Sequence, residues 1–136
     1  MPYCTKADLE RRYGKPELIR LTNRGRDGSL IHDETLSAAI ADADAEIDSA
    51  LRQGGYAVPL DSVPPEFTRH AGSIVRYFLY DAGRPEAVVQ DYEDARRWLD
   101  RLRSGQGGLP PVVEKTAVGV TRAMIYTDEL VALYTQ

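Results

Sequence analysis

The clearest pattern in the chain is a helical repeat of apolar residues before its midpoint. Between Asp33 and Gln53 these side chains recur at Leu36, Ile40, Ala43, Ile47 and Leu51. Such spacing places them on one face of an α-helix, and the two glycines that follow favour its end. The sequence therefore predicts an amphipathic helix over residues 33–53.

Two further segments repeat the same period. After Pro64 and Pro65, which suit the first turn of a helix, a stripe predicts a helix over residues 65–81. Another predicts a helix over residues 85–103, with Glu93 and Arg97 as an outward pair. The inward residues are Phe67, Ala71, Ile74, Val75, Phe78 and Leu79 in the first, and Val88, Tyr92, Ala95, Leu99 and Leu102 in the second. The first stripe is broad, which indicates the most buried of three helices sharing one core.

Shorter elements precede the long helices. Thr5 and Asp8 resemble a capping box and Gly14 is a stop signal, which predicts a helix over residues 6–13. Pro16 favours a second short helix over residues 17–22. Residues 23–28 are typical of a turn-rich loop, and residues 56–60 are expected to be extended because a proline follows Val58. The N-terminal part thus adds two short helices.

The C-terminal part has a different pattern. After the glycine-rich residues 104–108, residues 109–120 contain prolines and β-branched residues without a helical stripe, which favours an extended segment or a hairpin. Residues 124–134 are expected to form a short amphipathic turn or strand. The chain is therefore predicted to be mainly α, a small helical bundle over residues 1–104 with an extended C-terminal arm over residues 105–136. The arm's apolar surface favours docking on a partner.

Composition and charge narrow the functional classes. The 136 residues suit one domain, and a net charge of −4 argues against broad nucleic-acid binding. Residues 1–31 hold seven Lys/Arg against four Asp/Glu, whereas residues 32–53 hold one against six. This bipolar pattern suits either head-to-tail packing of identical copies or ordinary solvated faces. The lone Cys4, the absence of a leader and the lack of a long apolar run predict a soluble protein made in a reducing cytoplasm, with no membrane partner.

The candidate chemistry is sparse. The densest carboxylate cluster is Asp42, Asp44, Glu46 and Asp48, and a metal-assisted hydrolase would use Asp44, Asp48 and His70. No histidine stands at ligand spacing within that helix, so a solvated or partner-facing acidic stripe is favoured, and neither a catalytic residue, a metal nor a cofactor is predicted. Arg97 and Arg101 belong to a basic helix end, which either complements the helix dipole or contacts DNA. The acidic helix also disfavours another alternative, a small regulatory or DNA-binding helical protein.

An ordered set of short motifs resembles one family. These are the opening Tyr3 to Gly14, Glu17-Leu-Ile, Leu21-Thr, the acidic stretch Ala41 to Asp48 with Leu51, Gly55 to Leu60, Val63-Pro-Pro, and Arg69 to Tyr80. Together they resemble the Mu-like prophage neck protein family over residues 1–104. Tyr126 to Leu130 loosely resembles the close of that family, whereas Gln53-Gly-Gly and the longer proline-containing arm depart from it.

The resemblance implies a structural virion protein rather than an enzyme. It implies a helical adaptor of the head-tail connector that forms a ring beneath the portal, located in the virion neck and made in the host bacterial cytoplasm. The implied partners are further copies of the chain, the portal protein and a tail-side neck or tail-terminator protein, with DNA in the lumen as a further candidate contact. The candidate interface residues are Asp42, Asp44, Glu46, Asp48, Arg97, Arg101, Val112, Val113, Tyr126, Leu130 and Tyr134.

Overall fold

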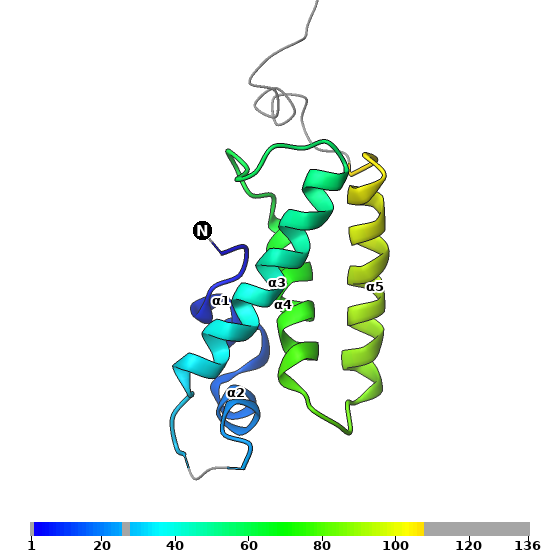
Figure 1. The fold of residues 1–136 in the computed structure, drawn as a ribbon. Coiled ribbons are helices and arrows are strands. Elements are labelled where there is room, and N and C mark those ends of the chain that lie inside the picture. The colour runs from blue at the N-terminus through cyan, green and yellow to red at the C-terminus, as the bar shows by residue number, and fades with distance from the viewer. Residues whose placement is uncertain (1, 26–27, 108–136) are drawn as a thin grey trace, which may run out of the picture. The chain divides into compact units, whose positions relative to one another are not determined.

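The computed structural model of the chain describes residues 2–25 and 28–107, which form helices and no strand (Figure 1). The helices are α1 (Lys6–Tyr13), α2 (Lys15–Thr22), α3 (Asp33–Gln53), α4 (Pro65–Leu79) and α5 (Glu86–Arg103). The prediction of a mainly α fold with three long and two short helices is confirmed. Most of the predicted arm, residues 108–136, lies outside the described residues, so the proposed domain boundary at residue 104 stays a prediction.

The helix bounds differ from the predicted ones by a few residues. Predicted and observed ranges coincide for α1 and α3. Helix α2 begins earlier than predicted because Gly14, with φ of 89°, lets the chain leave α1 and enter α2 across one residue. Helix α4 ends at Leu79 rather than at residue 81, and the backbone N–H of Tyr80 closes it on the carbonyl of Arg76.

The chain divides into two compact units. Unit 1 consists of Met1–Ile47 and Val63–Leu99, and unit 2 of Asp48–Ser62 and Asp100–Gln136. Unit 1 therefore contains α1, α2 and α4 with most of α3 and α5. The described part of unit 2 contains the last residues of α3 and α5 and the segments that follow them.

The core of unit 1 is built around Phe67 of α4. Its ring lies 5.6 Å from the ring of Tyr3 and 4.8 Å, edge to face, from the ring of Trp98 of α5. His70, about one turn along α4, stacks on Trp98 with the two ring centres 4.5 Å apart. The buried aliphatic residues of unit 1 complete its core: Leu9, Leu18, Leu21, Leu36, Ile47, Ile74, Val75, Leu79, Val88 and Leu99. As predicted, α4 is the most heavily buried long helix.

The inward face of α3 departs from the predicted stripe at one position. Leu36, Ala43 and Ile47 are buried as predicted, but Ile40 is only half-buried and Ala39 is fully buried. A residue as large as isoleucine at this edge of the face reaches solvent, whereas alanine is covered. Phe78 at the end of α4 is likewise half-buried. Both residues border the core rather than fill it.

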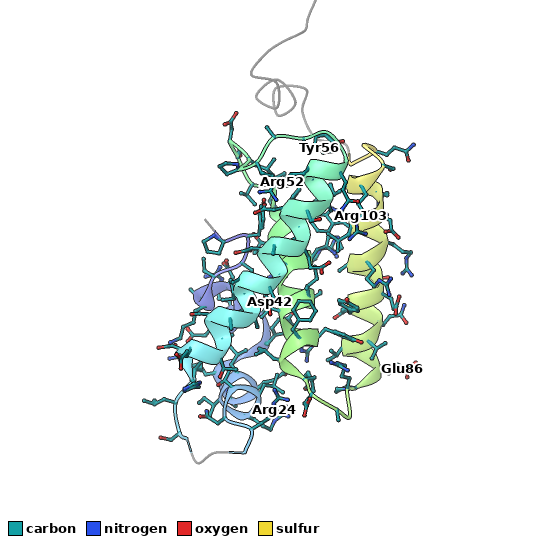
Figure 2. All side chains as sticks on the ribbon, viewed as in Figure 1. Arg24, Asp42, Arg52, Tyr56, Glu86 and Arg103 are labelled. Atoms are coloured by element: carbon teal, nitrogen blue, oxygen red, sulfur yellow. The ribbon has the colours of Figure 1, made fainter. Side chains whose placement is uncertain are left out.

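Unit 2 is closed by an approach of backbones that only glycine permits. A Cβ atom on Gly54 would lie 1.9 Å from the carbonyl oxygen of Leu102, so any other residue would force the backbone apart. The hydroxyl of Tyr56, labelled in Figure 2, donates to the carbonyl of Gly105 at 2.8 Å and accepts from the backbone N–H of Gly107 at 3.3 Å. The segment that follows α3 therefore holds residues 105 and 107 by hydrogen bonds of Tyr56.

Candidate functional site

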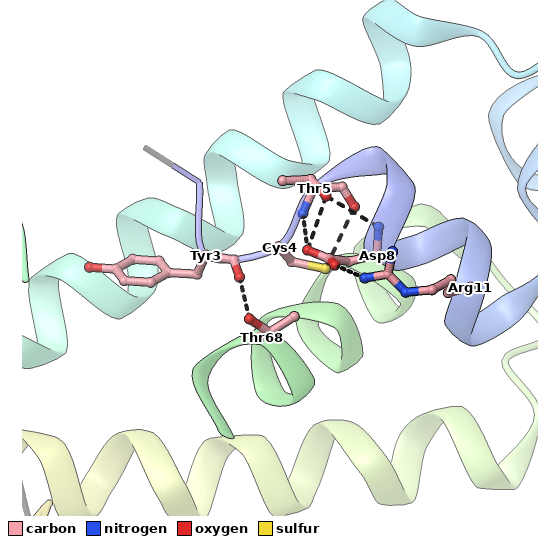
Figure 3. A network of polar contacts seen from close by, with 6 residues as sticks. All are labelled: Tyr3, Cys4, Thr5, Asp8, Arg11 and Thr68. Atoms are coloured by element: carbon pink, nitrogen blue, oxygen red, sulfur yellow. Dashed lines mark hydrogen bonds and ion pairs between the residues drawn. The ribbon is translucent and has the colours of Figure 1, made fainter. Parts of the chain in front are cut away.

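The N-terminal segment of unit 1 is fixed by backbone and side-chain hydrogen bonds. The backbone N–H of Tyr3 donates to Asp44 of α3 at 3.0 Å, and its carbonyl accepts from the hydroxyl of Thr68 of α4 at 2.9 Å. Figure 3 shows the second bond beside the capping box of α1, in which Thr5 and Asp8 bond to each other's backbone N–H. The segment thus connects α3, α4 and α1, and the predicted capping box is confirmed.

Cys4 lies in this anchored segment and is fully buried. Burial raises the pKa of its thiol to about 12, with the nearby carboxylate of Asp8 adding to the effect. A thiol of that pKa is protonated at neutral pH and is a poor nucleophile and metal ligand. Cys4 therefore fills space in the fold.

The four carboxylates of the acidic cluster on α3 have different surroundings. Asp42 and Glu46 are exposed, and Figure 2 shows Asp42 on the outer side of the helix. Asp44 is half-buried and accepts the hydrogen bond from Tyr3, while Asp48 is half-buried in unit 2. The cluster is therefore not one uniform surface, because Asp44 belongs to the internal bonding of unit 1.

His70 is buried and its ring is stacked. It is 5% exposed, packs against Trp98, and its Nε2 lies 3.3 Å from the guanidinium of Arg69. Within residues 2–25 and 28–107 no three histidine, cysteine, aspartate or glutamate side chains gather as metal ligands. The combination of Asp44, Asp48 and His70 that a hydrolase would need is thus not assembled there.

His32, the second histidine, caps a helix. Its Nδ1 lies 2.7 Å from the hydroxyl of Thr35 and 3.4 Å from the backbone N of the same residue, at the start of α3. A side chain that accepts from the third residue of a helix satisfies one of the free N–H groups of its first turn. The contacts of both histidines are therefore those of residues that stabilise the fold.

A half-buried ion pair joins α2 to α4. The Nε of Arg76 donates to Glu17 at 2.7 Å and a terminal nitrogen donates to its other carboxylate oxygen at 3.2 Å. The guanidinium also lies 4.4 Å from the ring centre of Tyr13. Burial raises the pKa of the Tyr13 hydroxyl, while its hydrogen bond with Ser73 and the charge of Arg76 oppose that rise. Sequence spacing did not predict this pair, because its members stand 59 positions apart.

A groove in the described part of unit 1 lies between α1, α2 and the segment before α3. It measures about 190 Å³ and is lined by Lys6, Glu10, Lys15, Ile19, Leu30, Ile31 and Asp33. Lys6 and Asp33 form an exposed ion pair of 2.8 Å across it. Leu30 is 77% exposed, the largest value of any large apolar side chain among the described residues. None of these residues was predicted as a candidate site.

Backbone contacts hold Leu30 in place. Its carbonyl accepts from the side-chain amide of Asn23 at 2.7 Å, and the same amide donates to the carbonyl of Ile19. Two residues later, the N–H of His32 donates to the hydroxyl of Thr22 at 2.9 Å. The exposed leucine therefore stands on a segment that is bonded to α2.

The remaining predicted interface residues fall in two groups. Arg97 is exposed in unit 1 and forms an ion pair with Asp94, while Arg101 is exposed in unit 2. The arm candidates Val112, Val113, Tyr126, Leu130 and Tyr134 lie outside the described residues. No helix in the described part of the chain has the length and apolar character of a membrane span.

Comparison with known proteins identifies relatives over most of the chain. Residues 3–127 match the family described as "Bacteriophage Mu, Gp36". The chain is similar to "Mu-like prophage FluMu protein gp36" of Haemophilus influenzae, with 35% identity over 103 residues, 76% of this chain and 72% of the relative. It is also similar to "Gene product J" of Escherichia phage Mu, with 32% identity over 117 residues, 86% of this chain and 82% of the relative. The resemblance to a Mu-like prophage family is thereby confirmed.

Proposed function

Because the chain belongs to the Bacteriophage Mu, Gp36 family, we propose that it is a structural protein of the virion of a Mu-like phage, the adaptor of its head-tail connector. In this role copies of the chain form a ring beneath the portal and link the filled head to the tail. The family match, which runs from residue 3 to residue 127, is the observation that carries the proposal.

The surroundings of the polar residues support a structural role. Asp44, His70 and Cys4, which an enzyme could use, make internal contacts in unit 1 or are fully buried there. By contrast, Leu30 and Asp42 face solvent. Adaptor work needs complementary outer surfaces on a rigid body rather than perturbed catalytic groups. We therefore assign the protein a binding function and no reaction.

The proposed partners follow from the position of such a ring. Neighbouring copies would contact each other side by side, the portal protein would bind on the head side, and a tail-side neck or tail-terminator protein would bind below. DNA passing through the lumen is a further candidate contact. Residues 105–136 are proposed to dock on a neighbour or on the portal, and the hydrogen bond between Tyr56 and Gly105 fixes the first residue of this segment.

Inactivation of the gene in its own phage tests this function. We expect an induced lysate without the protein to contain DNA-filled heads and separate tails by electron microscopy, because the connecting ring is missing. Expression of the intact chain from a plasmid should restore joined particles, and mass spectrometry should detect the protein in purified virions. Normal particles in its absence, or virions that lack the protein, would contradict the proposal.

A further inference from the structure

The groove of unit 1 combines a fixed apolar residue with a charged rim. Leu30 projects into solvent from a segment that hydrogen bonds of Asn23 and Thr22 hold against α2. A Cβ on Gly28 would lie 2.2 Å from the side-chain oxygen of Asn23, so a larger residue there would displace the side chain that bonds the Leu30 carbonyl. An exposed leucine on a well-bonded backbone is preorganised for contact, since docking would cost little further ordering.

The rim of the groove presents two lysines. Lys6 is paired with Asp33, yet both side chains remain largely exposed, at 46% and 71%. Lys15, at the start of α2, is exposed, and the lining also includes the half-buried carboxylate of Glu10. An exposed apolar residue beside two lysines, one of them already paired with Asp33, favours an occupant that is apolar in the middle and acidic at the edge that meets Lys15.

The outer face of α3 has that chemistry. Ala38, Ala41 and Ala45 are exposed on it and leave a shallow apolar surface that a projecting leucine can approach closely. The exposed carboxylates beside these alanines belong to Glu34, Asp42 and Glu46. Asp42 is labelled on this face in Figure 2. Both surfaces belong to unit 1, so every copy carries the groove and its complement.

We propose that the groove binds the outer face of α3 of a second copy, with Leu30 on the alanines and Lys6 and Lys15 beside the acidic residues. This inference rests on the proposed function, and it names the contact that joins neighbouring copies. Two different surfaces meet, so the contact is head-to-tail, and repetition around a closing rotation gives a ring. Residues 1–31 are net basic and residues 32–53 are net acidic. In the proposed contact, the basic part of one copy therefore faces the acidic part of the next.

Disulfide trapping between singly substituted copies tests this contact in the full chain. Leu30→Cys protein is mixed with Ala41→Cys protein and oxidised, and the joined species is measured by mass spectrometry. The native Cys4 contributes little background because it is buried and its pKa is raised to about 12. We expect the 30–41 dimer to exceed by at least ten-fold the product of a control mixture of Leu30→Cys with Gln90→Cys, an exposed position on α5. Equal yields would overturn the proposal.

A charge exchange gives a second, independent readout. Lys15→Glu alone and Asp42→Lys alone should each lower the yield of the 30–41 disulfide several-fold, because each places like charges together. A mixture of Leu30→Cys/Lys15→Glu with Ala41→Cys/Asp42→Lys should recover most of the yield. Failure of the mixture to recover, with both variants still folded by circular dichroism, would assign the groove to another occupant and overturn the proposal.

The two experiments distinguish a failure of the connector function from a failure of the groove contact. If the protein is present in virions and needed for tail joining while the 30–41 pair gives only the control yield, the groove proposal is wrong and the connector function stands. If the pair cross-links efficiently but the protein is absent from virions, the contact stands and the connector function is wrong.

Discussion

Charged side chains occur both in the interior and on the outer surface of unit 1, but their roles differ. Inside, Glu17 pairs with Arg76 and Asp44 accepts from Tyr3, with these side chains largely or partly withdrawn from water. Outside, Lys6 and Asp42 are exposed to solvent. Removing a buried partner leaves an unsatisfied group, whereas an exposed charge is replaced by water at little cost. Burial, rather than residue type, therefore separates the residues that stabilise the fold from those available for association.

The largest expected effect is at the centre of the interior. Phe67→Ala removes the ring that lies between Tyr3 and Trp98 and leaves a cavity, so we expect a loss of about 3–5 kcal/mol in the free energy of unfolding. Leu30→Ala is the matched surface control and should change it by less than about 0.5 kcal/mol. Urea unfolding followed by circular dichroism measures both. Similar losses of unfolding free energy in the two variants would contradict the distinction between the interior and the surface of unit 1.

The second effect concerns the ion pair between α2 and α4. Arg76→Met keeps the length of the side chain but leaves Glu17, whose side chain is 17% exposed, without its partner. We expect a loss of about 1–3 kcal/mol. The double variant Arg76→Met/Glu17→Leu should recover part of that loss, because no unpaired charge remains. A double variant as unstable as the sum of the single ones would show that the pair is not coupled.

The third effect separates two carboxylates of one helix. Asp44→Ala removes the acceptor of the Tyr3 N–H and should cost about 1–2 kcal/mol. Asp42→Ala, on the exposed side of α3, should stay within about 0.5 kcal/mol of the wild type. Parallel thermal unfolding of the two variants measures the difference. Equal melting temperatures would mean that the anchoring of Tyr3 adds nothing to stability.

The smallest effect is a dependence on pH. Hydrogen bonds from Thr5, mainly the backbone one, lower the pKa of Asp8 below its ordinary 3.8 in the folded state. The carboxylate therefore stabilises the fold above that pH, and its contribution is lost as the pH falls through the lowered folded-state pKa. Asp8→Ala should be less stable than the wild type by about 0.5–1 kcal/mol at pH 7. Denaturant unfolding at several pH values should show that the difference in unfolding free energy between the wild type and Asp8→Ala shrinks below pH 3.8. A difference that stays constant with pH would show that the ionised carboxylate of Asp8 is not its cause.

Local signals predicted most of the fold. The helical period located the three long helices, and the Thr5–Asp8 spacing located the start of α1, because these features depend on residues a few positions apart. Exact ends were less predictable. Gly14 serves two helices at once, and nothing in its neighbourhood indicates that α2 begins at the next residue.

The long-range contacts could not be predicted from spacing. Tyr3 and Asp44 stand 41 positions apart, so Asp44 looked like a member of a uniform acidic stripe. A single leucine in a turn-rich segment is an ordinary sequence feature, and the position of Leu30 depends on a hydrogen bond from the Asn23 side chain. The residues of the candidate surface therefore could not be identified without the structure, although the uneven distribution of charge along the chain is evident from the sequence.

The most direct test of the connector function is the position of the protein in the virion. A cryo-electron microscopy reconstruction of the tail-bearing phage should contain a ring of this chain, with α3, α4 and α5 recognisable, between the portal and the tail. A fusion of a small folded tag to the C-terminus should add density at that ring if particles still assemble. A ring at the neck that fits another protein, with this chain absent from the particle or located in the capsid shell or tail tube, would contradict the account.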